Sequence, residues 1–478
     1  MLKRNIRTMT AAALGSLLLG SCKLPALVEV KENRNVPTQF AGAGTDTASA
    51  AAKPWRLFFT DSNLVHLIDT ALARNQELRI TLQELTIARN DIRLRQGQLL
   101  PFVRGRVGIG AEKVGRYTSQ GAGDAATEIE EGKEVPETIT DYTGAVYATW
   151  EADIWKKLRN AKKAAISRYL ATVEGRSFVQ TELVGEVANS YYELLALDNQ
   201  LAIIRQNIAL QQNGLEIVKV QKQAARVTEL AVQKFAAEVL RTQSLEWEVR
   251  QRITETENRI NFLLGRFPQP VPRSGAPLLE QAPPAVAAGI PAQLLVNRPD
   301  IRRAEQELAA AKLDVLVARA EFLPSLGITA GVGLQAFRPA YLVKLPESVL
   351  FSLAGDLAGP LINKSAIRAE YSSAGARQLQ ALYRYERTVL NAYFEVSNQV
   401  ASIGNLEQSL GFRTKEVAAL TQSIDISNSL FASARADYLE VLMTQRDVLE
   451  SKLELVETKR NQLAAAVNLY RGLGGGWR

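Results

Sequence analysis

The stretch Pro101–Glu112, which reads PFVRGRVGIGAE, decides the fold because a related stretch, PSLGITAGVGLQ, occurs at Pro324–Gln335. Each begins at a Leu-Pro step, and proline both blocks helix continuation and pushes the preceding residue towards extended geometry. Apolar or small residues alternate with polar or small ones in both stretches, so period-two geometry predicts strands with two different faces. The repetition indicates a chain that is built twice from one plan.

Each stretch has a partner of the same kind. Tyr142–Ala152 alternates in the first copy, and the run from Val349 to Leu357 alternates in the second. These lengths suit the tilted strands of about 9–11 residues that cross a membrane as β-sheet. An ordinary soluble hairpin with one buried face explains any single run equally well, so the remainder of the chain has to decide between the two.

The N-terminus has the features of a lipoprotein signal. Lys3, Arg4 and Arg7 precede an apolar run that is too short to span a bilayer, and the segment ends in Leu19-Gly20-Ser21-Cys22. This tetrad resembles the bacterial lipobox, in which the cysteine is lipidated and becomes the first mature residue. Loss of residues 1–21 removes those three positive charges and no acid, so the net charge falls from +7 to +4. That charge is too weak to indicate a nucleic-acid partner.

Cys22 is the single cysteine of the chain. One cysteine excludes an internal disulfide framework and a thiolate metal cluster, so the covalent lipid is the one attached group that we expect, with no cofactor. The alternative is a buried thiol behind an ordinary signal peptide. Lys23 follows, which by resemblance to enterobacterial sorting favours the outer membrane. After the signal no run approaches 18 apolar residues, so no membrane-spanning helix is predicted.

Proline spacing and helical periodicity predict five parts. They are a signal peptide (1–21), an N-terminal lipid tether (22–60), a first repeat (61–267), a proline-rich linker (268–296) and a second repeat (297–478). The strand hairpins are expected at about 101–153 and 324–358, and the long helical hairpins at about 156–264 and 361–470. A helix, or a pair broken near Asn75, should begin at Asp61 or Ser62. If each helical hairpin folds at its middle, its arms have about 50 residues and a length of about 75 Å.

Four amphipathic strands cannot close a barrel alone, and each open edge in hydrocarbon leaves backbone groups unpaired at several kcal/mol apiece. Cyclic assembly removes the edges, so we expect each copy to contribute four strands to a shared barrel. The polar strand faces, including Arg104, Arg106 and Glu151, then line a water-filled lumen. Alternatively, Arg104 and Arg106 lie at the mouth of the barrel near lipopolysaccharide phosphates.

Several features together resemble the TolC-type outer membrane factors, in particular the lipidated channels of tripartite efflux systems. They are the lipobox, the duplicated plan, NRPDI at Asn297–Ile301, EFLPS at Glu321–Ser325 and ADYLEVL at Ala436–Leu442. The resemblance implies a mainly α fold with a membrane β-barrel, in which a homotrimer forms about 12 strands, a periplasmic α-helical barrel and an equatorial belt. It also implies a periplasmic adaptor protein and an inner-membrane pump of the resistance-nodulation-division type as partners, and outer-membrane lipid around the barrel.

The resemblance places a closed iris at the periplasmic helix tips. Carried onto this sequence, the gate consists of Leu439, Glu440, Met443 and Arg446, and threefold repetition makes a ring of each. The family often has aspartate where Met443 stands, so Glu440 is the main carboxylate here. The alternatives are a solvated, salt-bridging helix face for Glu440 and Arg446, and plain helix packing for Met443. The first-copy turn, Ala225–Leu230, lacks the glycine that is usual in the family.

Three other classes of protein compete with a small-molecule channel. An enzyme is disfavoured because His66 is the single histidine, which excludes a histidine triad or a multi-histidine metal site, and no glycine-rich phosphate loop follows a strand. A lipid-anchored coiled-coil spacer does not need four alternating strands. A channel for protein secretion uses the same architecture, and the lipobox favours efflux of small molecules such as drugs. We therefore expect an outer-membrane, lipid-anchored exit duct that extends into the periplasm of a Gram-negative bacterium.

Overall fold

The structure is a computed structural model, and it describes residue 26 and residues 31–40, 48–273, 275, 277–360, 362, 364–433 and 435–478. The expected lipidation site, Cys22, lies outside these residues. The chain divides into two compact units, which are described separately. The strand unit contains Ile87–Tyr169 and Gln306–Leu382, and the core unit contains Glu32–Thr86, Leu170–Glu305 and Tyr383–Arg478.

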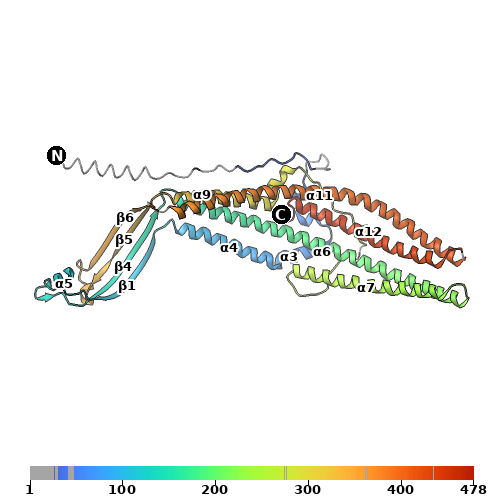
Figure 1. Ribbon diagram of the computed structural model, residues 1–478, viewed down its shortest axis with the longest axis horizontal. Coiled ribbons are helices and arrows are strands. Elements are labelled where there is room, and N and C mark those ends of the chain that lie inside the picture. Colours follow the sequence, from blue (N-terminus) through green and yellow to red (C-terminus); the bar gives the residue numbers. More distant parts are fainter. Residues whose placement is uncertain are drawn as a thin grey trace. The chain divides into compact units, whose positions relative to one another are not determined.

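Four long strands form one antiparallel sheet in the strand unit (Figure 1). They are β1 (Phe102–Glu112), β4 (Ile139–Ala152), β5 (Ser325–Ala336) and β6 (Val349–Ala358), in the order β1-β4-β5-β6. Opposed residues of neighbouring strands share a face, and Arg104, Tyr147, Gly331 and Ser352 form one such row across the sheet. The predicted alternation is therefore confirmed, with an apolar face and a polar face.

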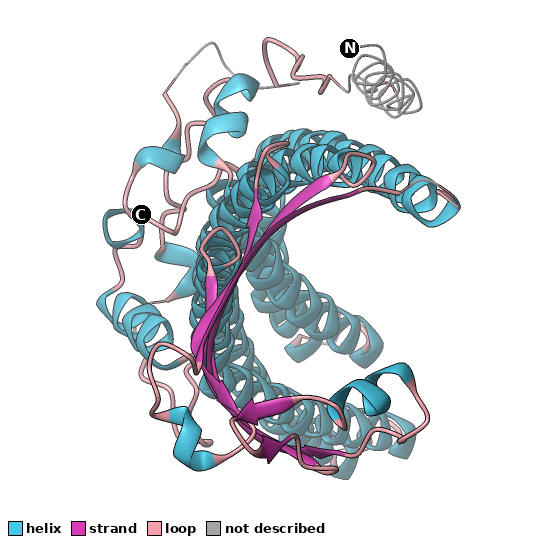
Figure 2. Cartoon of the chain, turned by 90° about the vertical axis from the view of Figure 1, so that its left-hand side faces the viewer, coloured by secondary structure: helices cyan, strands magenta, loops and turns pink. Residues whose placement is uncertain are grey.

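The sheet is strongly curved (Figure 2). On the polar face, a Cβ atom added to Gly333 would lie 2.4 Å from the Cβ of Ala145, and one on Gly331 would lie 2.8 Å from the Ser352 hydroxyl. On the apolar face, a Cβ atom added to Gly105 or Gly144 would meet nothing within 4 Å. Side chains converge on the inside of a curved sheet, so the polar face is the concave one and its glycines permit the bend.

The strand connections contain short elements that the sequence pattern did not predict. The β1–β4 connection holds α5 (Ser119–Asp124) and a small hairpin of β2 (Glu128–Glu130) and β3 (Lys133–Glu134). The β5–β6 connection holds α10 (Pro339–Leu342). Both connections lie at one end of the sheet, here called the loop end. The opposite end, where the strands join long helices, is called the helix end.

Each copy continues from its sheet strands into one long and one shorter helix. The first pair is α6 (Lys157–Gln223) and α7 (Glu229–Leu263), with 67 and 35 residues, and the second is α11 (Ser365–Ala432) and α12 (Tyr438–Gly472), with 68 and 35 residues. The duplication is confirmed. The expectation of two arms of about 50 residues is wrong, because residues 224–228 form the turn without any glycine or proline to mark it.

The predicted break at Asn75 separates two helices, α3 (Ser62–Arg74) and α4 (Gln76–Gly97). Asp61 is the N-cap of α3 and accepts a 2.8 Å hydrogen bond from the Asn63 amide, as the residue type predicts. The side chain of Asn75 accepts from the Leu78 amide (3.1 Å) and donates to the Leu263 carbonyl (2.9 Å), which fixes the break against α7.

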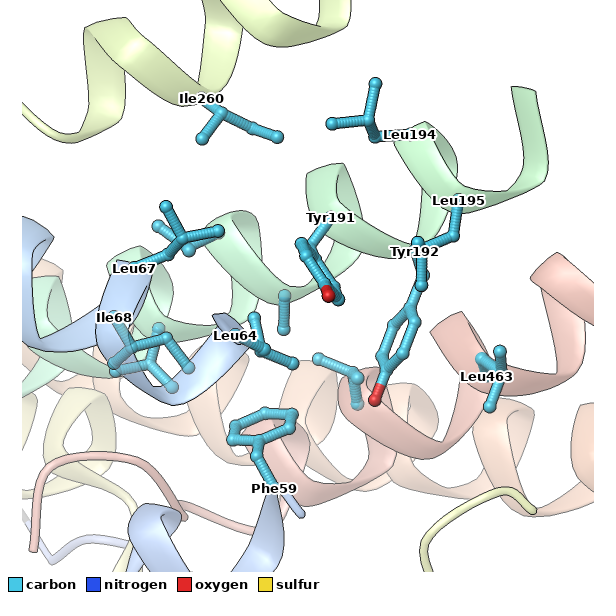
Figure 3. Close-up of a cluster of buried hydrophobic side chains, with 14 of the residues drawn as sticks. Phe59, Leu64, Leu67, Ile68, Tyr191, Tyr192, Leu194, Leu195, Ile260 and Leu463 are labelled. Carbon is cyan, nitrogen blue, oxygen red and sulfur yellow. The ribbon is translucent and has the colours of Figure 1, made fainter. Parts of the chain in front are cut away.

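The hydrophobic core of the core unit contains residues from many parts of the chain (Figure 3). Leu64, Leu67 and Ile68 from α3 belong to one cluster with Tyr191 from α6 and Ile260 from α7. The same cluster contains Trp55 and Phe58, the first and last residues of the short α2 (Trp55–Phe58), and Phe59 directly after it. The expected tether to residue 60 is therefore wrong at its C-terminal end, where these aromatic side chains are buried.

The second copy enters the core unit through short elements in the proline-rich region. These are η2 (Leu278–Glu280), η3 (Pro291–Gln293) and α8 (Leu294–Asn297). Another short helix, η1 (Ala50–Ala52), lies near the start of the described chain, before α2. Then α9 (Pro299–Ala320) begins at a proline, as predicted from the residue's fixed φ angle. Among the described residues, no helix is both long enough and apolar enough to cross a membrane.

Candidate functional site

The polar, concave face of the sheet carries all three residues that were expected in the lumen. Arg104 and Arg106 lie exposed on β1, and Glu151 lies on β4 towards the helix end. Glu151 is 2.6 Å from the Lys157 ammonium, which also approaches Glu321 at 3.8 Å. Burial lowers the pKa of Lys157, but the hydrogen bond to Glu151 and the charge of Glu321 outweigh it and raise that pKa. Lys157 therefore neutralises the predicted carboxylate.

Two further carboxylates of this face were missed by sequence reasoning. Asp141 on β4 accepts hydrogen bonds from the Gln335 amide (2.8 Å) and the Thr143 hydroxyl (3.1 Å). Asp356 lies exposed on β6, on the face of Ser352. The alternation of the second run placed Asp356 in the polar row, and that signal was enough to identify it. The concave face thus carries both charge signs, with arginines on one edge strand and an aspartate on the other.

Aromatic residues mark both ends of the sheet. At the helix end, the Trp150 indole donates to the Leu99 carbonyl (3.0 Å) and the Trp155 indole donates to the Pro324 carbonyl (2.7 Å). In the β5–β6 connection, the rings of Phe337 and Tyr341 meet edge to face at 5.2 Å. Amphipathic aromatic rings of this kind form the two girdles of membrane-spanning sheets, at the levels of the lipid headgroups.

The helix tips in the core unit turn by the same hydrogen-bonded pattern in both copies. Arg226 donates its amide to the Gln221 carbonyl (2.9 Å), and Arg435 donates to the Leu430 carbonyl (2.9 Å). This bond is characteristic of the Schellman motif, whose penultimate residue takes a left-handed conformation. Ala225 takes it with a φ of 56°, a backbone conformation that glycine adopts more readily than alanine. Hydrogen bonds from Gln233 and Lys222 lower the pKa of Glu229 beside this turn.

The predicted gate residues share one exposed face of α12. Val441 lies on the opposite face and is buried in a cluster that joins the two tips. The other members of this tip cluster are Val218, Ala231, Val232 and Phe235, with Leu215, Val227, Phe431, Tyr438 and Leu442 partly buried around them. Leu439 and Met443 are 46% and 55% exposed, and Glu440 and Arg446 are also exposed. More than half of Met443 is therefore left uncovered by the described chain. Asp447, which sequence reasoning missed, lies exposed beside Arg446.

Beneath this face lie polar side chains that are buried between the helices. Gln211 on α6 is 1% exposed, and both atoms of its amide lack a hydrogen-bond partner in the part of the chain that the structure describes. Gln445 on α12 is also buried, and its Nε2 atom lies 3.8 Å from the position of a Cβ on Gly214. Buried polar groups without partners cost free energy, so Gln211 makes the packing at this level of the hairpins less favourable than an apolar contact would.

The described residues contain no cluster of three or more histidine, cysteine, aspartate or glutamate side chains that would hold a metal ion. His66 lies exposed on α3, as expected for a surface residue of a helix. The geometry that stands out is therefore a curved amphipathic sheet with aromatic ends, and paired helical hairpins whose tips expose one ordered face.

Comparison with known proteins agrees with this geometry. The sequence matches the family described as "Outer membrane efflux protein" over residues 67–266 and 290–475. The chain belongs to this family. It is 28% identical over 463 residues to the pyoverdine export outer membrane protein OpmQ of Pseudomonas aeruginosa, with 97% of this chain and 95% of OpmQ covered. It is 27% identical over 450 residues to the cation efflux system protein CusC of Escherichia coli, with 93% of each covered.

Solved structures of outer membrane channels have the same fold. The open state of the MtrE outer membrane channel of Neisseria gonorrhoeae superposes with a TM-score of 0.82 at 21% identity, and the match covers 96% of this chain and 99% of MtrE. The predicted fold class, mainly helical with membrane-type strands and an internal duplication, is confirmed. The chain is an outer-membrane efflux channel that extends into the periplasm, and its family is one of transport channels and not of enzymes.

Proposed function

We propose that three copies of the chain close one duct through the outer membrane. The observation that carries this proposal is the sheet, whose apolar face is convex and whose edges on β1 and β6 have no strand partner within the described chain. Three sheets of four strands make a barrel of 12 strands with no open edge. The convex apolar face then contacts lipid and the concave polar face lines the water-filled lumen.

We further propose that the exposed face at the start of α12 is the periplasmic gate. Threefold symmetry places Leu439, Glu440, Met443 and Arg446 in rings around one axis. Their exposure in the single chain supports this role, because the opposite face of α12 is already packed in the tip cluster. The buried Gln211, with its unpartnered amide, supports a helix contact that can rearrange at low cost when the tips separate.

Conduction across a planar bilayer tests the duct and its gate together. The purified lipidated protein should form pores of low open probability, and the double change Leu439→Ala with Glu440→Ala should raise that probability several-fold by removing two rings. Leu240→Ala with Glu248→Ala, which truncates the same residue types at exposed positions of α7, is the matched control and should leave the pores closed. Absence of conduction even from the Leu439/Glu440 variant would refute the proposed trimeric duct with its gate at α12.

We propose that Cys22 carries the lipid that anchors the mature chain, as its lipobox context supports. Cys22→Ser should abolish incorporation of labelled palmitate, because the hydroxyl of serine does not replace the thiol in the thioether attachment. Ser21→Ala, which retains a small residue before Cys22, is the control and should keep the label. Unchanged labelling of Cys22→Ser would place the lipid elsewhere or exclude it.

The partners that fit this duct are a periplasmic adaptor and an inner-membrane pump of the resistance-nodulation-division type. The relatives are named for pyoverdine export and for cation efflux, so the duct itself is compatible with different small solutes and the pump selects among them. We propose efflux of small molecules, without enzymatic activity and without any cofactor beyond the lipid. Protein secretion is the second candidate, and a deletion strain that keeps its secreted proteins but becomes sensitive to drugs, dyes or metal ions would rule it out.

A further inference from the structure

The charges on the concave face of the sheet differ between central and edge strands. On β4, Glu151 is paired with Lys157, and Asp141 accepts hydrogen bonds from Gln335 and Thr143. On the edge strands β1 and β6, Arg104, Arg106 and Asp356 are exposed and have no ion-pair partner among the described residues. On this face of the described chain, β1 therefore carries unpaired positive charges towards the helix end and Glu112 at its loop end, whereas β6 carries an unpaired negative charge.

The strand positions predict how the two edges would meet in a closed ring. A line perpendicular to the strands joins Val107, Gly144, Leu334 and Val349. Val107 is the midpoint of β1, whereas the midpoints of β4, β5 and β6 lie 1.5, 3.5 and 4.5 residues from this line towards the helix end. The displacement is about 1.5 residues per strand, or about 5 Å against a strand spacing of about 4.8 Å. This corresponds to a tilt of about 45°, as membrane barrels require.

The next step of the same progression sets the register across the seam. The next strand in the ring is β1 of the neighbouring copy, and its midpoint, Val107, should lie about 6 residues from the line towards the helix end. The line through Val349 therefore crosses that β1 about 6 residues towards its loop end, at position 113. Antiparallel pairing then places Asp356 opposite Arg106, and Ala358 opposite Arg104, of that copy. The same register places Leu353 opposite Ile109, so that apolar residues also meet on the convex face.

We propose that the seam between copies is held in register by an ion pair inside the lumen, from Asp356 of one copy to Arg106 of the next, with Arg104 as its diagonal neighbour. This inference rests on the proposed trimer and specifies its interface. Opposite charges directly across an antiparallel pair stabilise it. A slip of two residues towards the loop end of β1 would bring Asp356 opposite Gly108 and remove the ion pair. The opposite slip would exchange Arg106 for Arg104, and the steady displacement of the strand midpoints disfavours it. The pair also reduces the positive charge that β1 alone would present to the lumen.

Disulfide trapping in membranes tests the register. Directly opposed residues of an antiparallel pair have Cα atoms about 4.5–5.5 Å apart, which suits a disulfide. The variant Arg106→Cys with Asp356→Cys should form covalent trimers on oxidation, because each copy links to both neighbours. Ile109→Cys with Leu353→Cys should do the same from the convex face, and it leaves the ion pair intact. The control Arg106→Cys with Ser352→Cys uses the same strands and face but is about 13 Å out of register, so it should not link.

The outcomes separate this inference from the proposed function. If the unmodified protein is trimeric and conducts, but the 106/352 pair links in preference to 106/356 and 109/353, the register is wrong and the channel proposal stands. If the unmodified protein neither trimerises nor conducts, the channel proposal fails and the seam with it. Charge exchange gives a second readout. Arg106→Asp or Asp356→Arg alone should lower the temperature at which the trimer dissociates in detergent, and the double exchange should restore it. Equal loss in all three variants would overturn the ion pair.

Discussion

Arg298→Ala is expected to lower the free energy of unfolding by about 3–5 kcal/mol, because it removes one partner of a buried ion cluster. Arg298 is 7% exposed and donates hydrogen bonds to Asp300 (2.7 Å), Glu395 (2.8 Å) and the Gly472 carbonyl (2.6 Å) at the end of α12. Burial lowers its pKa, but Asp300 and Glu395 outweigh this effect and raise it, so the guanidinium is always charged. Without it, two carboxylates and a helix end lose their donor.

Urea unfolding in detergent, followed by tryptophan fluorescence, measures this loss. Arg377→Ala removes an ion pair of similar geometry, 2.9 Å from Glu370, but both side chains are more than half exposed. That control should change stability by less than about 1 kcal/mol, as surface pairs do. Arg298→Lys should fall between the two, because lysine keeps the charge but not the fork of donors. A loss below about 1 kcal/mol in Arg298→Ala would mean that Arg471, 3.2 Å from Glu395, compensates.

Tyr470→Ala is expected to cost about 3–5 kcal/mol, because it leaves a large cavity in the core. The ring is 2% exposed and stacks on Phe58 with centroids 4.0 Å apart, and its hydroxyl donates to the Lys53 carbonyl (2.7 Å). Tyr470→Phe keeps the ring and removes only that hydrogen bond, so it should cost about 1 kcal/mol. Equal losses in the two variants, measured by the same urea titration, would show that the hydrogen bond and not the stacking stabilises this region.

The free energy of unfolding, measured as a function of pH above about 10, tests the same residue independently. Burial raises the pKa of Tyr470 from 10.0 to about 12. The folded state thus holds the phenolic proton more tightly than the unfolded state. The contribution of the Tyr470 phenol to the free energy of unfolding is therefore complete below pH 10 and is lost as pH rises towards 12. Tyr470→Phe should reduce the loss of stability over this range. It should not abolish the loss, because burial also raises the pKa of Tyr192 to about 12.

Features that depend on neighbours in the sequence were predictable. The alternation in Pro101–Glu112 assigned Arg104 and Arg106 to one strand face, because successive side chains of a strand always point to opposite sides. Asp61 and Pro299 marked helix starts, since the capping carboxylate and the fixed φ angle act within one turn. The turn after α6 was placed at Ala225–Leu230 by resemblance alone, close to the observed turn at residues 224–228. Composition did not mark it, because Ala225 takes a left-handed conformation that is usual for glycine.

Features that depend on distant partners were not predictable in this way. Trp55, Phe58 and Phe59 looked like the end of a tether, yet Phe58 stacks on Tyr470, more than 400 residues later. The charge of Glu151 was correctly placed on its face, but its neutralisation by Lys157 requires the start of α6 to fold back towards β4. The gate residues were chosen by resemblance, and the i, i+4, i+7 spacing of Leu439, Met443 and Arg446 predicted a common helix face. That this face is left exposed depends on the tip cluster, which packs Val441 on the opposite face.

The sequence by itself determined the duplicated plan, the strand faces and most helix starts, because these follow from local backbone geometry and from periodicities of two and of about 3.6 residues. Only the tertiary structure decided that β4 and β5 pair at the centre of the sheet, which leaves β1 and β6 as the edges. That order depends on free energies of long-range strand pairing, which no single segment encodes. It is also what sets Arg106 and Asp356 on opposite edges, ready to meet across a seam between copies.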